Sequence, residues 1–182
     1  PSAPVFSPDG TFGVSATPGA STSPVVFAST SPAVCTVSGG TATIVAAGTC
    51  TLTADQAGDT NYSAAPQVTL NVTIGQATQA ITGLAATPSA PVFSPGGTFA
   101  VSATPGASTS PVVFGTSTPA VCSVSGSTVT TLAAGTCTVT ADQAADTNYS
   151  AAPQVTLNVT IGQATQAITA FAATPSAPLF SP

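Results

Sequence analysis

Apolar and polar residues alternate along most of the chain, and the alternation is clearest at residues 153–162. There, every second residue from Val155 to Ile161 is apolar, and the residues between them are Thr or Asn. A period of two predicts a strand with one face buried. Residues 97–106 alternate in the same way and end at Pro105-Gly106, a turn signal. No part of the chain has the 3.6-residue period of a helix, so the pattern predicts an all-β fold.

Shorter strands are predicted at residues 76–87, at 111–117 and on both sides of a Ser/Gly turn near residue 126. Residues 141–153 are predicted to form a loop, because they carry two Asp, an Asn and a Tyr without regular alternation. About seven short strands separated by turn signals are typical of a β-sandwich.

The whole pattern repeats with an offset of 87 residues, since Pro1-Ser2-Ala3-Pro4 returns at Pro88 and again at Pro175. A repeat of this size fits a small domain, so the sequence predicts tandem β-sandwiches. With strand 76–87 placed first in the unit, residues 1–75 form a repeat without its first strand. Residues 76–162 then form a complete repeat, and residues 163–182 supply the first strand of a third. We expect the chain to be a window of a longer, semi-rigid array.

Each repeat contains two cysteines fifteen residues apart, Cys35 with Cys50 and Cys122 with Cys137. The exact repetition favours one disulfide within each unit, and we expect it to clamp a β-hairpin or two neighbouring strands. Metal binding by free thiols is the alternative, but the chain has no His and no C-x-x-C motif. Paired cysteines indicate an oxidising compartment, the cell surface or the medium.

Charge is nearly absent from the chain. It has no Lys, Arg or His, and five Asp residues give a net charge of −5. A chain without cations cannot neutralise phosphates, which excludes nucleic acid and anionic lipid headgroups as favourable partners. No apolar run approaches the ~20 residues of a membrane helix, so we expect no membrane insertion. Ser and Thr have no His or Lys to act as a base, so the sequence predicts no enzyme and no cofactor.

Calcium is the one cofactor that the acidic residues allow. The candidate ligands recur between repeats and are Asp55, Asp59, Asp142 and Asp146. Oxygen-rich loops bind Ca²⁺, and two carboxylates can also serve a glycosidase as acid and base. The simpler interpretation is a polar loop at the domain end, in which Asp and Asn bind their own backbone. That interpretation is favoured, because Ca²⁺ takes six to eight oxygens.

Four sites match the N-glycosylation motif: Asn61, Asn71, Asn148 and Asn158. In a chain rich in Ser and Thr such matches arise easily, and we do not expect these asparagines to be glycosylated. Alternating Thr side chains on the predicted strand at 136–140 offer a flat surface for a carbohydrate or another filament. The simpler role of such residues is the solvent face of a strand.

Residues 31–75 and 118–162 share the order CTVSG or CSVSG, then GTCT, A-x-Q-A and N-Y-S-A-A-P, followed by the alternating last strand. In these motifs the chain resembles the bacterial immunoglobulin-like repeats of large surface proteins, fibrillar adhesins and extracellular filaments. The resemblance implies an immunoglobulin-like sandwich that serves as an extracellular spacer, stalk or fibre, with other copies of itself as neighbours. An adhesin segment that binds carbohydrate or another surface is the alternative. The chain departs from antibody domains in having no Trp.

Overall fold

The computed structural model describes residues 3–172, which form thirteen strands and no helix. The first unit contains β1 (Thr11–Gly13), β2 (Val25–Ser29), β3 (Cys35–Ser38), β4 (Thr41–Ile44), β5 (Gly48–Gln56) and β6 (Val68–Ile74). The second unit contains β7 (Thr82–Thr87), β8 (Thr98–Thr104), β9 (Val112–Thr116), β10 (Cys122–Ser125), β11 (Thr128–Thr131), β12 (Gly135–Gln143) and β13 (Val155–Ile161). The prediction of an all-β fold made of tandem sandwiches is confirmed.

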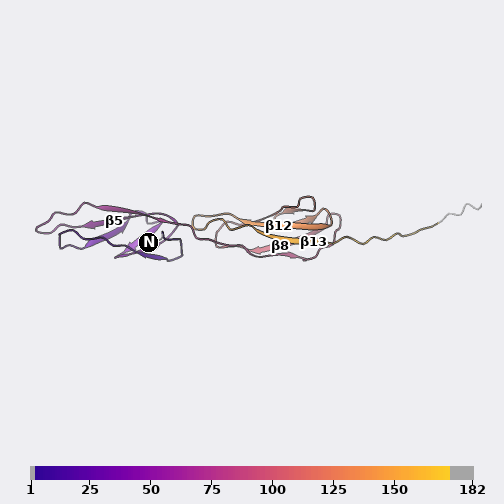
Figure 1. Cartoon of the computed structure of the whole chain (residues 1–182), viewed down its shortest axis with the longest axis horizontal. Helices are drawn as coiled ribbons and strands as arrows, with labels where there is room; N and C mark the ends of the chain where they lie inside the picture. The colour runs from indigo at the N-terminus through magenta and orange to yellow at the C-terminus, as the bar shows by residue number, and fades with distance from the viewer. Residues whose placement is uncertain (1–2, 173–182) are drawn as a thin grey trace, which may run out of the picture.

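Each unit is built from two sheets. In the second unit, a sheet in the order β10-β11-β8-β7 faces a sheet in the order β13-β12-β9. In the first unit the corresponding sheets are β1-β4-β3 and β2-β5-β6. All strand pairs within the sheets are antiparallel. The two units lie end to end, and residues 163–172 continue beyond the second unit as an extended segment (Figure 1).

The alternation in the sequence determines which side chains fill the core. In β13, Val159 and Ile161 are buried while Asn158 and Thr160 are exposed. In β12, Cys137, Val139 and Ala141 are all completely buried. Side chains of the two facing sheets therefore meet in one apolar layer per unit, as expected for a sandwich.

Two sequence-based expectations about local structure were wrong. The loop predicted at residues 141–153 begins later, because β12 continues through Gln143 and pairs with β9 as far as Val112. The cysteines do not clamp a hairpin. In the first unit the hairpin is β3–β4, and Cys50 lies on β5 in the opposite sheet. After β4, the chain crosses at residues 45–47 to the other sheet, so a short sequence separation still gives a bond between sheets.

Candidate functional site

Both disulfides join the two sheets of a sandwich through its core. Cys35 is bonded to Cys50 and Cys122 to Cys137, with Cα atoms 5.6 and 5.7 Å apart. All four cysteines are completely buried, and the described residues contain no free cysteine. The predicted pairing within each unit is confirmed. Because water does not reach the sulfur atoms, a reductant has no access to these bonds in the folded protein.

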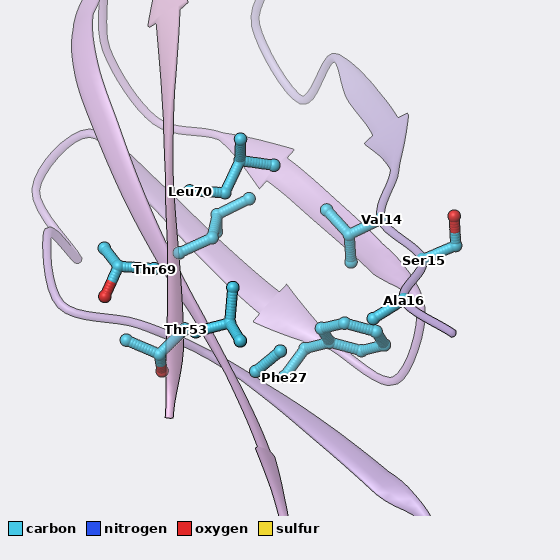
Figure 2. Close-up of a pocket in the computed structure, with 10 residues that line it drawn as sticks. Val14, Ser15, Ala16, Phe27, Thr53, Thr69 and Leu70 are labelled. Atoms are coloured by element: carbon cyan, nitrogen blue, oxygen red, sulfur yellow. The ribbon is translucent and has the colours of Figure 1, made fainter. Parts of the chain in front are cut away.

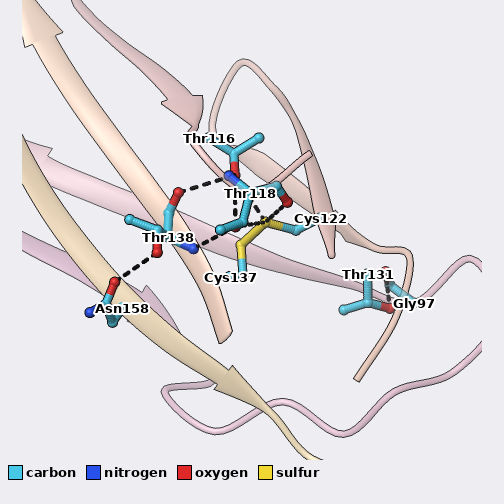
Figure 3. The surroundings of a disulfide bond; sticks show 8 residues. All are labelled: Gly97, Thr116, Thr118, Cys122, Thr131, Cys137, Thr138 and Asn158. Carbon is cyan, nitrogen blue, oxygen red and sulfur yellow. Dashed lines mark hydrogen bonds between the residues drawn. A yellow bond between two sulfur atoms is a disulfide. The ribbon is translucent and has the colours of Figure 1, made fainter. Parts of the chain in front are cut away.

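Two hydroxyl groups lie beside each disulfide, and Figure 3 shows those of Thr116 and Thr118. Thr116 Oγ1 lies 3.2 Å from Cys122 Sγ, and Thr118 Oγ1 accepts a hydrogen bond from the Thr138 backbone at 2.8 Å. In the first unit Ser29 and Ser31 take the same positions, with Ser29 Oγ 3.3 Å from the sulfur of Cys35. The hydroxyls also tie the loop before the cysteine strand to the facing sheet.

Asp59 and Asp146 organise a loop at the end of each unit. The carboxylate of Asp146 accepts hydrogen bonds from the backbone of Thr109, Asn148 and Tyr149. The backbone N–H of Thr109 is the main cause that lowers the pKa of Asp146 from its ordinary value of 3.8 to about 2. Asp59 makes the equivalent bonds, and chiefly the N–H of Thr22 lowers its pKa to about 2 as well.

The other two calcium candidates lie on strands. Both oxygens of Asp55 accept from Gln67 Nε2, and both oxygens of Asp142 accept from Gln154 Nε2. Among residues 3–172, no three His, Cys, Asp or Glu side chains gather in a group that could hold a metal ion. The carboxylate oxygens are thus committed to hydrogen bonds within the loops and strands. Calcium binding stays a hypothesis from the sequence.

The four glycosylation motifs lie in different surroundings. Asn61 and Asn71 are exposed, and Asn158 is exposed on β13, where its Oδ1 accepts from Thr138 at 2.8 Å. Asn148 is half-buried, and its Oδ1 accepts the backbone N–H of Ala47 in the first unit at 2.9 Å. Modification at any of these sites stays a prediction.

The contact between the two units is a site that the sequence did not reveal. The ring of Tyr149, from the second unit, meets the ring of Phe6, from the first, edge to face with centroids 5.5 Å apart. Tyr149 and Ala77 pack against the core of the first unit. The backbone of Ala77 bonds to Asn148 and Ser150, and the side chain of Gln76 bonds to the Asp146 carbonyl. We call this set of contacts the joint.

Hydrogen bonds near the joint hold the residues that form it in place. Phe6 is held by the hydrogen bond from its N–H to the carbonyl of Gly75, beside a parallel bridge from Val5 to Gly75. Asn148 and Tyr149 are held by the carboxylate of Asp146. The connection between β6 and β7 therefore does not act as a free hinge, because the residues on both sides of it are bonded to each other.

The first unit also carries a row of three apolar hollows between its sheets. The middle hollow, of about 220 Å³, is lined by Val14, Ala16, Phe27 and Leu70 among others (Figure 2). Two further hollows adjoin it. One, of about 270 Å³, is lined by Val25 and Ala65 among others, and the other, of about 680 Å³, is lined by Phe12 and Val72 among others. Shared residues such as Ala16, Val14 and Leu70 connect the three hollows, which we call the groove.

The described residues contain no helix long and apolar enough to cross a membrane. No family model matches the chain, and no curated protein is significantly similar to it. Solved structures that it resembles include domains 1–6 of the surface layer protein SbsC, at 18% identity and a TM-score of 0.33. Another is a C-terminal 282-residue fragment of intimin in complex with the intimin-binding domain of the translocated intimin receptor, at 18% identity and a TM-score of 0.32.

These matches cover 78% and 76% of this chain, but only 20% of the SbsC structure and 51% of the intimin fragment. The chain thus spans about a fifth and about half of the length of these two solved chains.

Proposed function

We propose that this chain is a structural segment of a fibre, stalk or spacer outside a bacterial cell. Its function depends on length, stiffness and chemical resistance, and not on a reaction. The observation that carries the proposal is the joint, in which Tyr149 packs on Phe6 and the side chain of Asn148 bonds to the backbone of Ala47. Direct contact between successive sandwiches limits their reorientation, as a load-bearing or spacing element requires.

Chemical resistance is supported by two independent features. The disulfides are buried and cross the core of each sandwich, and such bonds are typical of proteins that leave the reducing cytosol. The chain contains no Lys or Arg, so proteases that cut after cations find no site. The absence of His and Lys also leaves Ser and Thr without a base, which supports a role without catalysis.

Small-angle X-ray scattering of the monomeric chain tests the proposed stiffness. We expect a single elongated particle whose scattering matches two sandwiches in the arrangement of Figure 1. A broad ensemble of orientations between the two units would contradict the proposal.

The alternative function, an adhesin segment that binds carbohydrate or another surface, has its own test. The purified chain is applied to an array of glycans and to immobilised surface polysaccharide. We expect no saturable binding, because the carboxylates of Asp55, Asp142 and Asp146 are engaged in hydrogen bonds within the protein. Saturable binding to one glycan class would favour the adhesin role.

A further inference from the structure

Residues of the second unit complete the apolar core of the first. The buried members of that core include Phe6, Ile44 and Ile74, and Ala77 and Tyr149 pack against them. Phe6 is only 9% exposed, and the ring of Tyr149 lies edge to face against it. Among the described residues, the core clusters of the second unit contain only its own side chains. The second unit therefore closes the core of the first, and the reverse does not hold.

A hydrogen bond from the second unit also holds the segment that links the two sheets of the first. Residues 45–47 carry the chain from β4 to β5. Two of their N–H groups donate to the carbonyl of Val34, within the unit. The third, that of Ala47, donates to Asn148 Oδ1 at 2.9 Å, across the joint. Ala47 packs against the core of the first unit, so the loss of this bond would loosen a segment that borders the core.

The loop that makes these contacts is bonded to the chain segment between the units. The N–H of Ala77 donates to the carbonyl of Asn148, and the N–H of Ser150 donates to the carbonyl of Ala77, both at 2.9 Å. Ala77 and Tyr149 thus form a parallel bridge. Because these bonds join the loop to the connection between the units, both meet the first unit as one surface.

Asp146 places the two residues whose side chains cross the joint. Its carboxylate accepts hydrogen bonds from the N–H groups of Asn148 and Tyr149 at 2.8 and 2.9 Å. It also accepts from the N–H of Thr109 at 2.8 Å, which ties the loop to the rest of the second unit. The loop therefore presents its side chains in a fixed orientation, which lowers the entropy lost when they contact the first unit. Asp146 is a positioning residue for the joint.

The sequence of this loop is a property of the repeat. Residues 146–150 read DTNYS, and so do residues 59–63. Within it, Asn148, Tyr149 and Ser150 match the N-glycosylation motif. In the structure the same three residues provide a side-chain acceptor, an aromatic ring and a backbone donor to the joint. Contacts between units thus account for the motif without a glycan.

From these observations we propose that DTNYS is a docking motif that closes the core of the preceding sandwich and couples the unfolding of the two units. The partner that fits the end of the first unit at Phe6 is thus the DTNYS loop of the next repeat. The free energy of unfolding of the first unit then includes a contribution from the folded second unit. The inference concerns stability and goes beyond the proposed function, because a joint can orient two units without stabilising either.

Coupling between neighbours changes how a chain of repeats opens. Stability becomes the sum of the intrinsic stability of each unit and a term for each interface between units. A unit that unfolds uncovers the core of the unit before it, so its opening costs the free energy of one unit and one joint. In this protein the first unit gains from the joint, and the strand amides of its core report the gain.

The first test compares the local stability of the two units by hydrogen exchange, with mass spectrometry of peptic fragments of the full chain. Fragments with β3 and β4 differ in sequence from those with β10 and β11, so the two units are measured separately. Tyr149→Ala is expected to make the protected amides of β3 and β4 exchange about tenfold faster, because the ring that covers Phe6 is lost. Tyr149→Phe keeps the ring and is expected to exchange as the unmodified chain does.

The matched control is Tyr62→Ala, which makes the same change within the first unit itself. Tyr62 is 50% exposed, and it belongs to none of the core clusters of the described residues. This substitution is expected to accelerate exchange in β3 and β4 less than Tyr149→Ala does, although Tyr149 belongs to the other unit. Only coupling across the joint predicts that order.

A second, milder variant removes the hydrogen bond across the joint. Asn148→Ala deletes the acceptor of the Ala47 N–H and is expected to make the protected amides of β4 and β5 exchange about threefold faster. Asn61→Ala, at the equivalent position in the first unit, is expected to leave them unchanged. If the second unit of Tyr149→Ala loses its own protection, the comparison of Asn148→Ala with Asn61→Ala decides.

Independent unfolding of the two units would overturn the inference. It would appear as exchange in the first unit that neither Tyr149→Ala nor Asn148→Ala changes, or as an equal effect of Tyr62→Ala and Tyr149→Ala. Either result together with a stiff monomer in the scattering experiment would leave the proposed spacer function intact. A flexible monomer whose first unit still depends on Tyr149 would contradict the proposed function and keep the coupling.

Discussion

Phe6 and Tyr149 meet edge to face with an interplanar angle of 86°, although 143 positions separate them and they belong to different sandwiches. Tyr62 has the same place in the first unit and is half exposed. The two repeats thus provide one tyrosine that lies in the joint and one that does not. Comparing variants of the two separates the effect of the contact from the effect of the residue itself.

Tyr149→Ala is expected to loosen the joint. The substitution removes a ring pair worth about 0.5–1.5 kcal/mol beyond its buried area. Small-angle scattering of the monomer should then show a broader distribution of orientations between the two units. Tyr62→Ala, measured at the same dilution, should leave the distribution unchanged. Equal flexibility in both variants would show that the ring pair does not hold the units.

The buried disulfides should resist reduction in the folded chain. We expect no reaction with dithiothreitol in native buffer and full reduction in denaturant, because all four sulfur atoms are shielded from solvent. Cys122→Ala with Cys137→Ala should lower the free energy of unfolding of the second unit by about 2–4 kcal/mol. Denaturant unfolding followed by a probe in each unit measures the loss, and Cys35→Ala with Cys50→Ala serves as the matched control. Reduction under native conditions would contradict the shielding.

Acid should destabilise the loops at the ends of the units. The pKa values of Asp59 and Asp146 are lowered from 3.8 to about 2, mainly by backbone hydrogen bonds from Thr22 and Thr109. A lowered pKa in the folded state adds stability above the ordinary value, and this stability is lost as the pH falls from about 4 to about 2. Thermal unfolding between pH 7 and pH 2 measures the effect. Asp59→Asn with Asp146→Asn should reduce the melting temperature at neutral pH and flatten its dependence in this window.

An unchanged acid profile in that double variant would assign the acid sensitivity to another group. The charge-conserving variants Asp59→Glu and Asp146→Glu test the geometry, because a longer side chain keeps the charge and displaces the carboxylate from the three backbone donors.

Gln143 is expected to be one of the most sensitive positions in the second unit. Its side chain is buried, and it bonds to the backbone of Gly106, Ser108 and Ser110 at 2.7 to 3.1 Å. Gln143→Met keeps the size and leaves these buried groups without partners, at a cost of about 1–3 kcal/mol or more. Gln154→Met, at an exposed position, should change stability by less than about 0.5 kcal/mol. Chemical denaturation compares the two variants, and equal stability would show that the hydrogen bonds of the Gln143 side chain do not stabilise the second unit.

The strands were predictable because each is short, alternates with a period of two and has the same pattern in both repeats. Val155 to Ile161 is the clearest case, and it forms β13. The pairing of Cys122 with Cys137 followed from the repeat alone. The sequence did not predict that this disulfide joins the two sheets. Spacing in the sequence cannot show that the chain crosses from one sheet to the other after β11.

The pattern of neighbouring residues in the sequence could not predict the joint or the hydrogen bonds of the Gln143 side chain. Gln143 appeared in the sequence as one polar residue in a loop, but it ends a strand and its amide is turned inward to three backbone groups. Phe6 and Tyr149 come together only when two sandwiches are placed end to end. A tyrosine at the same place in both repeats was the only signal, and it did not identify the partner ring.

Cryo-electron microscopy of the native material outside the cell tests whether the protein is a fibre of sandwiches joined end to end. We expect a continuous fibre of sandwiches in which successive units repeat the contact between Phe6 and Tyr149. Isolated strings attached to a cell, each ending in a different globular tip and with variable angles between units, would contradict it.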